Sequence, residues 1–187
     1  SITSRPVSVS VGAEYRHNRI SGASDPISQN LGFWVLNGQA VSGKQSVKEA
    51  YGEVVVPLLS DMSFVHNLEL NGAARITDYS DSGEVETWKV GGIYEPVRGI
   101  RFRVTQSRDI RAPNLTELRG PQQKSTIGLT DPLTGLQTNP VVIRGSNPAL
   151  RPEKADSFTA GIIISPGGGG AFSRMRLSVD YYNIQVE

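Results

Sequence analysis

The feature that most constrains this chain is an alternation of apolar and polar residues that recurs in seven separate stretches. The clearest stretch runs from Asn67 to Thr77. Successive side chains of a β-strand point to opposite faces, so the pattern predicts strands with one apolar and one polar face. No stretch has a helical period, and we predict an all-β fold, an antiparallel up-and-down meander of about seven strands. The other stretches begin near Val7, Glu49, Thr87, Ile100, Ser157 and Met175.

The connections between these strands differ in length according to their order in the chain. Two are long, 17–46 after the first strand and 109–154 after the fifth, and both are odd-numbered. The even-numbered connections are short, such as the one across Pro96 to Gly99. Odd and even connections of a meander lie at opposite ends, and bacterial outer-membrane barrels have long extracellular loops and short periplasmic turns. We therefore expect 17–46 and 109–154 to be extracellular.

The two faces of the strands predict different surroundings. Charged residues lie opposite the apolar sets, where a barrel would have its polar lumen, and the apolar sets would then face lipid. The same alternation suits an ordinary antiparallel sheet packed on one side. The alternative is therefore a soluble or surface-displayed β-sandwich module for ligand binding or adhesion. In the barrel interpretation, the lipid-facing residues are Val9, Val11, Leu68, Leu70, Trp88, Val90, Tyr94, Phe102, Leu177 and Val179.

Composition and motifs argue against catalysis and nucleic-acid binding. The 187 residues include 19 Lys and Arg, 18 Asp and Glu, two His and no Cys. A net charge of +1 provides no basic excess for a phosphate backbone. His17 and His66 have no metal-ligand partners at suitable spacing, and no nucleophile–base motif occurs. We predict that the protein is not an enzyme and that it has no metal and no cofactor.

Several segments resemble the β-barrel of TonB-dependent outer-membrane receptors. The most specific are 107–118, with the sequence SRDIRAPNLTEL, and 145–156, which contains NPALRPE. Such elements lead from a strand into a large loop and back in that family. The segments 41–58, 68–79 and 179–184 are similar to family strands and occur in the same order. The resemblance covers most of the chain.

The resemblance implies a monomeric barrel of 22 strands with a plugged lumen, which imports a scarce nutrient across the bacterial outer membrane. The partners would be the ligand, outer-membrane lipid and TonB, the last through an N-terminal region that 1–187 lacks. Ferric siderophore, heme, cobalamin and oligosaccharide all remain open as the ligand. Seven strands cannot close such a barrel, so we expect a fragment whose open strand edges allow self-association.

The long loops contain the residues that we expect to bind ligand. Aromatic rings suit sugars or aromatic chelates, and Arg suits anionic ligands. Any one of these side chains could instead serve only to fold its loop. The candidates are Phe33, Trp34, Arg111, Asn114, Glu117, Arg119 and Gln122.

Overall fold

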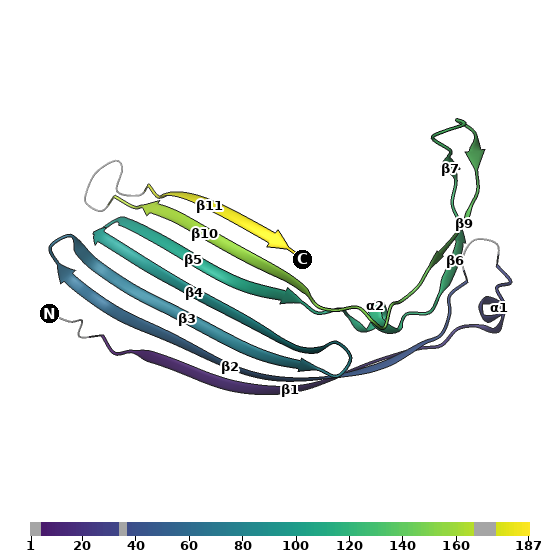
Figure 1. Cartoon of the computed structure of the whole chain (residues 1–187), viewed down its shortest axis with the longest axis horizontal. Helices are drawn as coiled ribbons and strands as arrows, with labels where there is room; N and C mark the ends of the chain where they lie inside the picture. Colours follow the sequence, from purple (N-terminus) through teal and green to yellow (C-terminus); the bar gives the residue numbers. More distant parts are fainter. Residues whose placement is uncertain (1–4, 34–36, 167–174) are drawn as a thin grey trace.

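The computed structural model describes residues 5–33, 37–166 and 175–187. Seven strands form one sheet in the order β1-β2-β3-β4-β5-β10-β11, with antiparallel neighbours throughout (Figure 1). This confirms the predicted all-β meander. The elements are β1 (Ser8–Gly22), α1 (Pro26–Gln29), β2 (Val41–Met62), β3 (Val65–Tyr79), β4 (Gly83–Val97), β5 (Ile100–Arg111), α2 (Leu115–Arg119), β6 (Gln123–Thr126), β7 (Leu129–Thr130), β8 (Gln137–Thr138), β9 (Val141–Arg144), β10 (Glu153–Ile164) and β11 (Leu177–Val186).

The sheet is curved (Figure 1), and its two faces differ in how far their side chains are buried. Side chains on the concave face of a bent sheet converge and cover one another, whereas those on the convex face spread apart. All buried strand side chains in the described residues lie on the face opposite the alternating apolar residues, which carries most of the charged groups and which we call the inner face. They include Gln45, Val47, Thr77, Val85 and Ile163.

The apolar set lies on the opposite, convex face, which we call the outer face. Cross-strand pairing places Val54 between Val9 and Gly72, and Tyr94 between Leu68 and Phe102. Register and alternation put all ten predicted lipid-facing residues on this face. Several are largely exposed, with Val11 at 79% and Val90 at 58%. Their contact with lipid stays a prediction.

Two tight turns, between β2 and β3 and between β4 and β5, lie at the end of the sheet away from the long connections. Between β4 and β5 the turn passes through Gly99, whose φ of 90° is accessible to glycine at little cost. Between β2 and β3 the turn residue Phe64 accepts a 2.7 Å hydrogen bond at its carbonyl from the Tyr94 hydroxyl. None of the described helices is long and apolar enough to cross a membrane.

Candidate functional site

The long connections and the short helices lie together at one end of the sheet (Figure 1). The first connection is shorter than the predicted 17–46, because β1 and β2 stay paired as far as Gly22 and Val41. The expected bounds were wrong here because both faces of this extension carry polar residues, so no alternation marks it. The second connection lies within the predicted 109–154, beginning after Arg111 and ending before Glu153.

The first connection folds around α1. The Asp25 carboxylate accepts hydrogen bonds from the backbone N–H groups of Ile27 and Ser28, at 3.0 and 2.9 Å. These bonds lower the pKa of Asp25, together with its side-chain hydrogen bond to Ser28, which contributes most. Farther along, the Asn37 side chain exchanges two hydrogen bonds with the backbone of Phe33. The local fold of this connection is therefore fixed by short-range polar contacts.

The second connection begins with the helix α2, which is capped by its own sequence. The Asn114 side chain accepts a hydrogen bond from the N–H of Glu117 at 2.9 Å, and the Glu117 carboxylate accepts one from the N–H of Asn114 at 2.8 Å. This reciprocal arrangement is a capping box. Leu118 is 1% exposed, and Arg119 forms an ion pair with Asp81 in the β3–β4 turn. The helix is thus anchored against the end of the sheet.

The entrance and the exit of the second connection are tied together below this helix. Arg111 forms ion pairs with Glu117 at 2.9 Å and with Glu153 at 3.6 Å. The N–H of Asn147 donates a 2.9 Å hydrogen bond to the carbonyl of Glu117. The two segments that resemble the receptor family most closely therefore meet in space, and we call this group of four residues the neck.

A two-tiered hairpin continues beyond the neck. Its lower ladder pairs β6 with β9, and its upper ladder pairs β7 with β8. At the tip, the Asp131 carboxylate accepts hydrogen bonds from the N–H of Leu133 at 2.9 Å and the hydroxyl of Thr134 at 2.6 Å. These bonds lower the pKa of Asp131. The hairpin extends away from the sheet (Figure 1).

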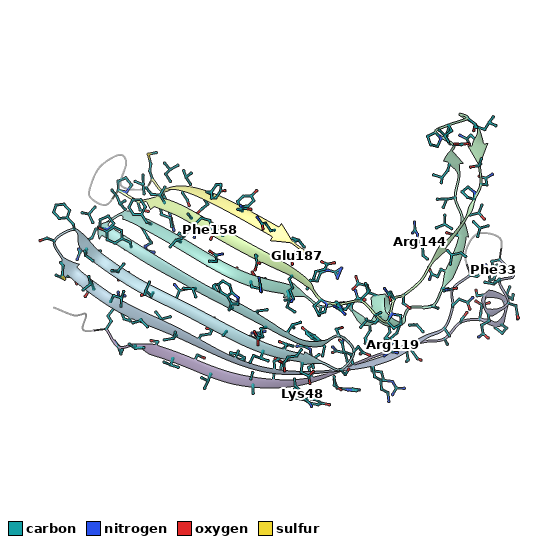
Figure 2. All side chains as sticks on the ribbon, in the orientation of Figure 1. Phe33, Lys48, Arg119, Arg144, Phe158 and Glu187 are labelled. Atoms are coloured by element: carbon teal, nitrogen blue, oxygen red, sulfur yellow. The ribbon has the colours of Figure 1, made fainter. Side chains whose placement is uncertain are left out.

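Six of the seven ligand-binding candidates lie in the described residues, some in the contacts that hold the neck and others exposed. Arg111, Asn114, Glu117 and Arg119 all make contacts that hold α2 and the neck. Phe33 is 48% exposed, and Gln122 is also exposed. Trp34 lies outside the described residues. Figure 2 places the labelled Phe33 and Arg119 at the same end of the molecule. Ligand contact stays a prediction for all seven.

The inner face carries a network of charged side chains on the first three strands, β1 to β3. Arg16 and Arg75 both pair with Glu49, at 3.5 and 3.3 Å, and the Glu49 side chain is only 8% exposed. The guanidinium of Arg75 also stacks over the ring of Tyr51, 5.2 Å from its centroid. Glu49, Tyr51 and Arg75 border a depression of about 420 Å³, which Lys89 also lines. The inner face is therefore suited to polar contents.

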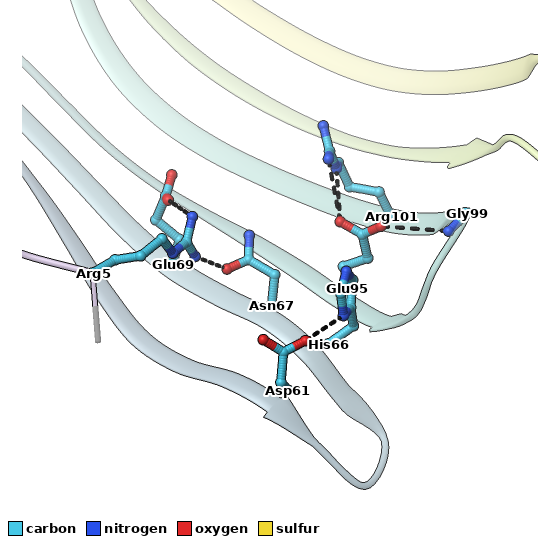
Figure 3. Close-up of polar contacts among 8 residues, drawn as sticks. All are labelled: Arg5, Asp61, His66, Asn67, Glu69, Glu95, Gly99 and Arg101. Atoms are coloured by element: carbon cyan, nitrogen blue, oxygen red, sulfur yellow. Dashed lines mark hydrogen bonds and ion pairs between the residues drawn. The ribbon is translucent and has the colours of Figure 1, made fainter. Parts of the chain in front are cut away.

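Further ion pairs extend along the inner face toward the tight turns. Figure 3 shows Glu95 with Arg101, at 3.2 Å. The same view shows Arg5 beside Glu69 at 3.7 Å. It also shows His66 beside Asp61 at 3.1 Å, a contact that the strand register puts on the outer face next to the β2–β3 turn. These charged groups come from several strands, so the polar lining spans much of the sheet.

One inner-face pair depends on a glycine between its partners' strands. Arg103 and Asp180 lie 2.7 Å apart, on β5 and β11, with β10 between them. A Cβ at Gly161 of β10 would collide with the Asp180 carboxylate. The missing side chain at this position therefore gives the ion pair its space.

On the outer face, every strand changes from apolar to polar residues on the way to the long connections. The apolar residues at this change are Tyr15, Ala50, Ile76, Trp88, Val104, Phe158 and Tyr181, and Ile110 of β5 is an apolar exception beyond it. The next residues on that face are His17, Lys48, Asp78, Glu86, Gln106, Asp156 and Asn183. We call this change the outer-face border.

The border crosses the strands at an angle that follows from the register. Directly paired residues on neighbouring strands can be followed from Tyr181 in β11 to Val56 in β2, five strands away. The residues between them are Ala160, Val104, Gly92 and Leu70. On β2 the border lies at Ala50, six residues away from Val56, which gives 1.2 residues per step. With a rise of ~3.3 Å per residue and a strand spacing of ~4.8 Å, the border makes an angle of about 40° with the line that crosses the strands at right angles.

This angle has a direct geometric meaning. If the border follows the level surface of a membrane, the strands are tilted by about 40° from the membrane normal. Strands of outer-membrane barrels are tilted by ~35–45°. The sequence analysis did not identify the polar residues beyond the border. Among them, Arg108 and Asp156 form a bidentate ion pair with two hydrogen bonds of 2.7 Å. Extending the alternation of β5 past Val104 would have revealed it.

The described residues provide no metal centre. No group of three or more His, Cys, Asp or Glu side chains among them could hold a metal ion. His17 lies 3.3 Å from the Ser46 hydroxyl, and His66 contacts Asp61. In these described contacts, each His therefore has one polar neighbour.

Comparison with known protein families gives a match over nearly the whole chain. The family model described as "TonB dependent receptor-like, beta-barrel" matches residues 3–187. No curated protein and no solved structure matches the chain.

Proposed function

Because this chain belongs to the TonB-dependent receptor family, whose members are outer-membrane receptors and transporters, we propose that it imports a scarce nutrient. In this proposal, 1–187 is one part of the wall of a larger closed barrel in the outer membrane. TonB provides the energy through another region of the receptor. The ligand is a siderophore, heme, cobalamin or an oligosaccharide.

The slanted outer-face border carries the membrane part of this proposal. A strand tilt of about 40° is the value that a closed transmembrane barrel requires. A β-sandwich would instead cover its apolar face with a second sheet. Among the described residues, the only other sheets are the two short ladders of the hairpin, which lie beyond the end of the main sheet (Figure 1). The tilt therefore supports the barrel over the sandwich alternative.

Two further observations support transport. The inner face carries buried and half-buried ion pairs, such as those of Glu49, and such a face suits a water-filled or plugged lumen. The long connections lie on the polar side of the border, so they would project from the membrane on one side. We assign them to the extracellular side, where they would meet the ligand first.

The test removes the hairpin while keeping the neck. In the complete receptor, residues 123–144 are replaced by two glycines, which join Gln122 to Gly145. These two residues are already close, since a Cβ at Gly145 would lie 3.1 Å from Gln122 Cγ. A second variant replaces 24–39 by a short turn, because the strands on either side stay paired to Gly22 and Val41. Both variants should assemble in the outer membrane.

The readouts are ligand binding to intact cells and uptake into the cytoplasm or periplasm. We expect each shortened receptor to keep its heat-resistant barrel and to lose binding of a siderophore, heme, cobalamin or oligosaccharide probe. In the receptor with intact loops, loss of TonB should abolish uptake while binding persists. Unchanged binding after both replacements would refute the assignment of the loops.

A further inference from the structure

Basic side chains gather on the outer face of β1 and β2, beyond the outer-face border. Arg19 lies directly opposite Lys44 in the register of these two strands, and Lys48 lies on the same face of β2, next to the border. All three side chains are exposed. Figure 2 places the labelled Lys48 on the convex side of the sheet. We call Arg19, Lys44 and Lys48 the cationic patch.

The pairing of Arg19 with Lys44 is unfavourable by itself. Like charges directly opposite one another in a sheet destabilise it. In the described part of the chain, neither side chain forms an ion pair with a carboxylate, and the residues outside that part include no Asp or Glu. On the neighbouring strand β3, Asp78 lies opposite Lys48 and not opposite Lys44. The arrangement therefore favours an anion from outside residues 1–187.

The depth of the cationic patch indicates the kind of anion. The inference rests on the proposed function, because it uses the membrane position of the sheet. With an advance of ~2.5 Å per residue along the membrane normal, Lys48 lies about 3 Å beyond the border and Lys44 about 13 Å beyond it. The headgroup layer of a phospholipid bilayer is only ~5–8 Å thick on each side. The patch thus extends farther than a phospholipid headgroup and suits a taller, sugar-containing headgroup with several phosphates.

The residues on the membrane side of the border suit the acyl chains of the same molecule. On β1, Tyr15 pairs with Lys48, and Val11 lies farther toward the middle of the apolar band. Both Tyr15 and Val11 are largely exposed. We propose that this surface binds a phosphorylated glycolipid of the outer leaflet, with acyl chains over Val11 and Tyr15 and phosphates at the cationic patch.

Acidic residues limit this surface to β1 and β2. Beyond the border, the outer face of β3 and β4 carries Asp78, Glu84 and Glu86, and all three are exposed. Carboxylates at these positions repel phosphate groups. The glycolipid is therefore held over the first two strands rather than spread evenly around the sheet.

The experiment measures binding of fluorescent lipid A, a phosphorylated glycolipid, to the complete receptor in detergent micelles. The competitors are unlabelled lipid A, dephosphorylated lipid A, phosphatidylglycerol, inorganic pyrophosphate and polyglutamate. The double variant Arg19→Gln/Lys44→Gln removes the like-charge pair. Its matched control, Arg98→Gln/Arg176→Gln, removes two exposed arginines at the end of the sheet with the tight turns.

We expect the double variant to bind lipid A about 30-fold more weakly, and the control to stay within about twofold of the parent. Only unlabelled lipid A should displace the probe efficiently. Equal binding to the parent and the double variant would overturn the cationic patch, and equally efficient displacement by any other competitor would overturn the glycolipid assignment. Nutrient uptake is measured in parallel, and normal uptake beside either negative result leaves the proposed function intact.

A stability measurement separates lipid binding from a structural role of the two cations. In phosphatidylcholine vesicles without glycolipid, the double variant should unfold at the same or a higher guanidinium concentration than the parent, because a repulsion has been removed. A lower unfolding midpoint would show that Arg19 and Lys44 stabilise the receptor itself, and would overturn their assignment to a lipid ligand.

Discussion

Placing a charge at different depths on the outer face tests whether that face contacts lipid. On β2 the border lies between Ala50 and Lys48. With a tilt of about 40°, each residue advances ~2.5 Å along the membrane normal. Val54 is then about 13 Å inside the border, close to the middle of an apolar band that is ~25 Å tall in such barrels. Ala50, on the same strand and face, is only about 3 Å inside.

The magnitudes follow from these depths. An Arg on the lipid face costs ~2–4 kcal/mol at the membrane midplane and ~0–1 kcal/mol near the interface. We therefore expect Val54→Arg to lower the folding equilibrium constant about 30- to 700-fold, and Ala50→Arg to lower it less than tenfold. Val55→Arg is the matched control, because Val55 is the next residue and pairs with Asn71 on the inner face.

The assay is guanidinium unfolding of the complete receptor folded in phospholipid vesicles, followed by tryptophan fluorescence. We expect Val54→Arg to have the lowest free energy of unfolding. The free energies of unfolding of Ala50→Arg and Val55→Arg should be much closer to that of the parent. Equal losses for Val54→Arg and Ala50→Arg would refute the depth assignment. If Val55→Arg were the most destabilised variant, the inner face rather than the outer face would be the one in an apolar environment.

Two further predictions concern the loops. Leu118→Ala should cost about 2–5 kcal/mol of local stability, because Leu118 is 1% exposed where α2 lies against the sheet. Hydrogen exchange should then accelerate at the Leu118 and Gly120 amides. Unchanged exchange would argue against this anchor. At the hairpin tip, the pKa of Asp131 is lowered, so its stabilising effect is complete above the unfolded pKa of about 3.9 and is lost as the pH falls through the folded pKa. Protection of the Leu133 amide should therefore decrease in acid, whereas in Asp131→Asn it should not depend on pH in that range.

The strands and their faces could be predicted because period-two alternation is a local property of the sequence. The alternation from Asn67 to Thr77 specifies both the strand β3 and which of its residues lie on the outer and inner faces. The extension of β1 and β2 toward Gly22 and Val41 could not be read in this way. Polar side chains occupy both of its faces, so pairing with the neighbouring strand, rather than burial, decides its length.

The candidate site likewise contains contacts between near neighbours in the sequence, which could be predicted, and contacts between distant residues, which could not. The capping box of Asn114 and Glu117 was readable from the sequence, as Asn followed three residues later by Glu, and it was overlooked. Contacts between distant residues leave no such signal: Arg103 and Asp180 are 77 residues apart, and Arg111 and Glu153 are separated by the whole hairpin. For this reason the sequence suggested ligand contacts for Arg111 and Arg119 without revealing their carboxylate partners.

The neck has a consequence for how receptors of this kind can diversify. Arg111, Glu117, Asn147 and Glu153 join the two ends of the connection before the hairpin begins. The entropic cost of closing this loop therefore depends only on the number of residues in the hairpin above the neck. Each doubling of the hairpin's length costs just ~0.6 kcal/mol. Insertions and deletions above the neck would leave the wall of the sheet unaffected. The exposed hairpin can thus change in evolution as a separate unit while the strands of the main sheet keep their sequence.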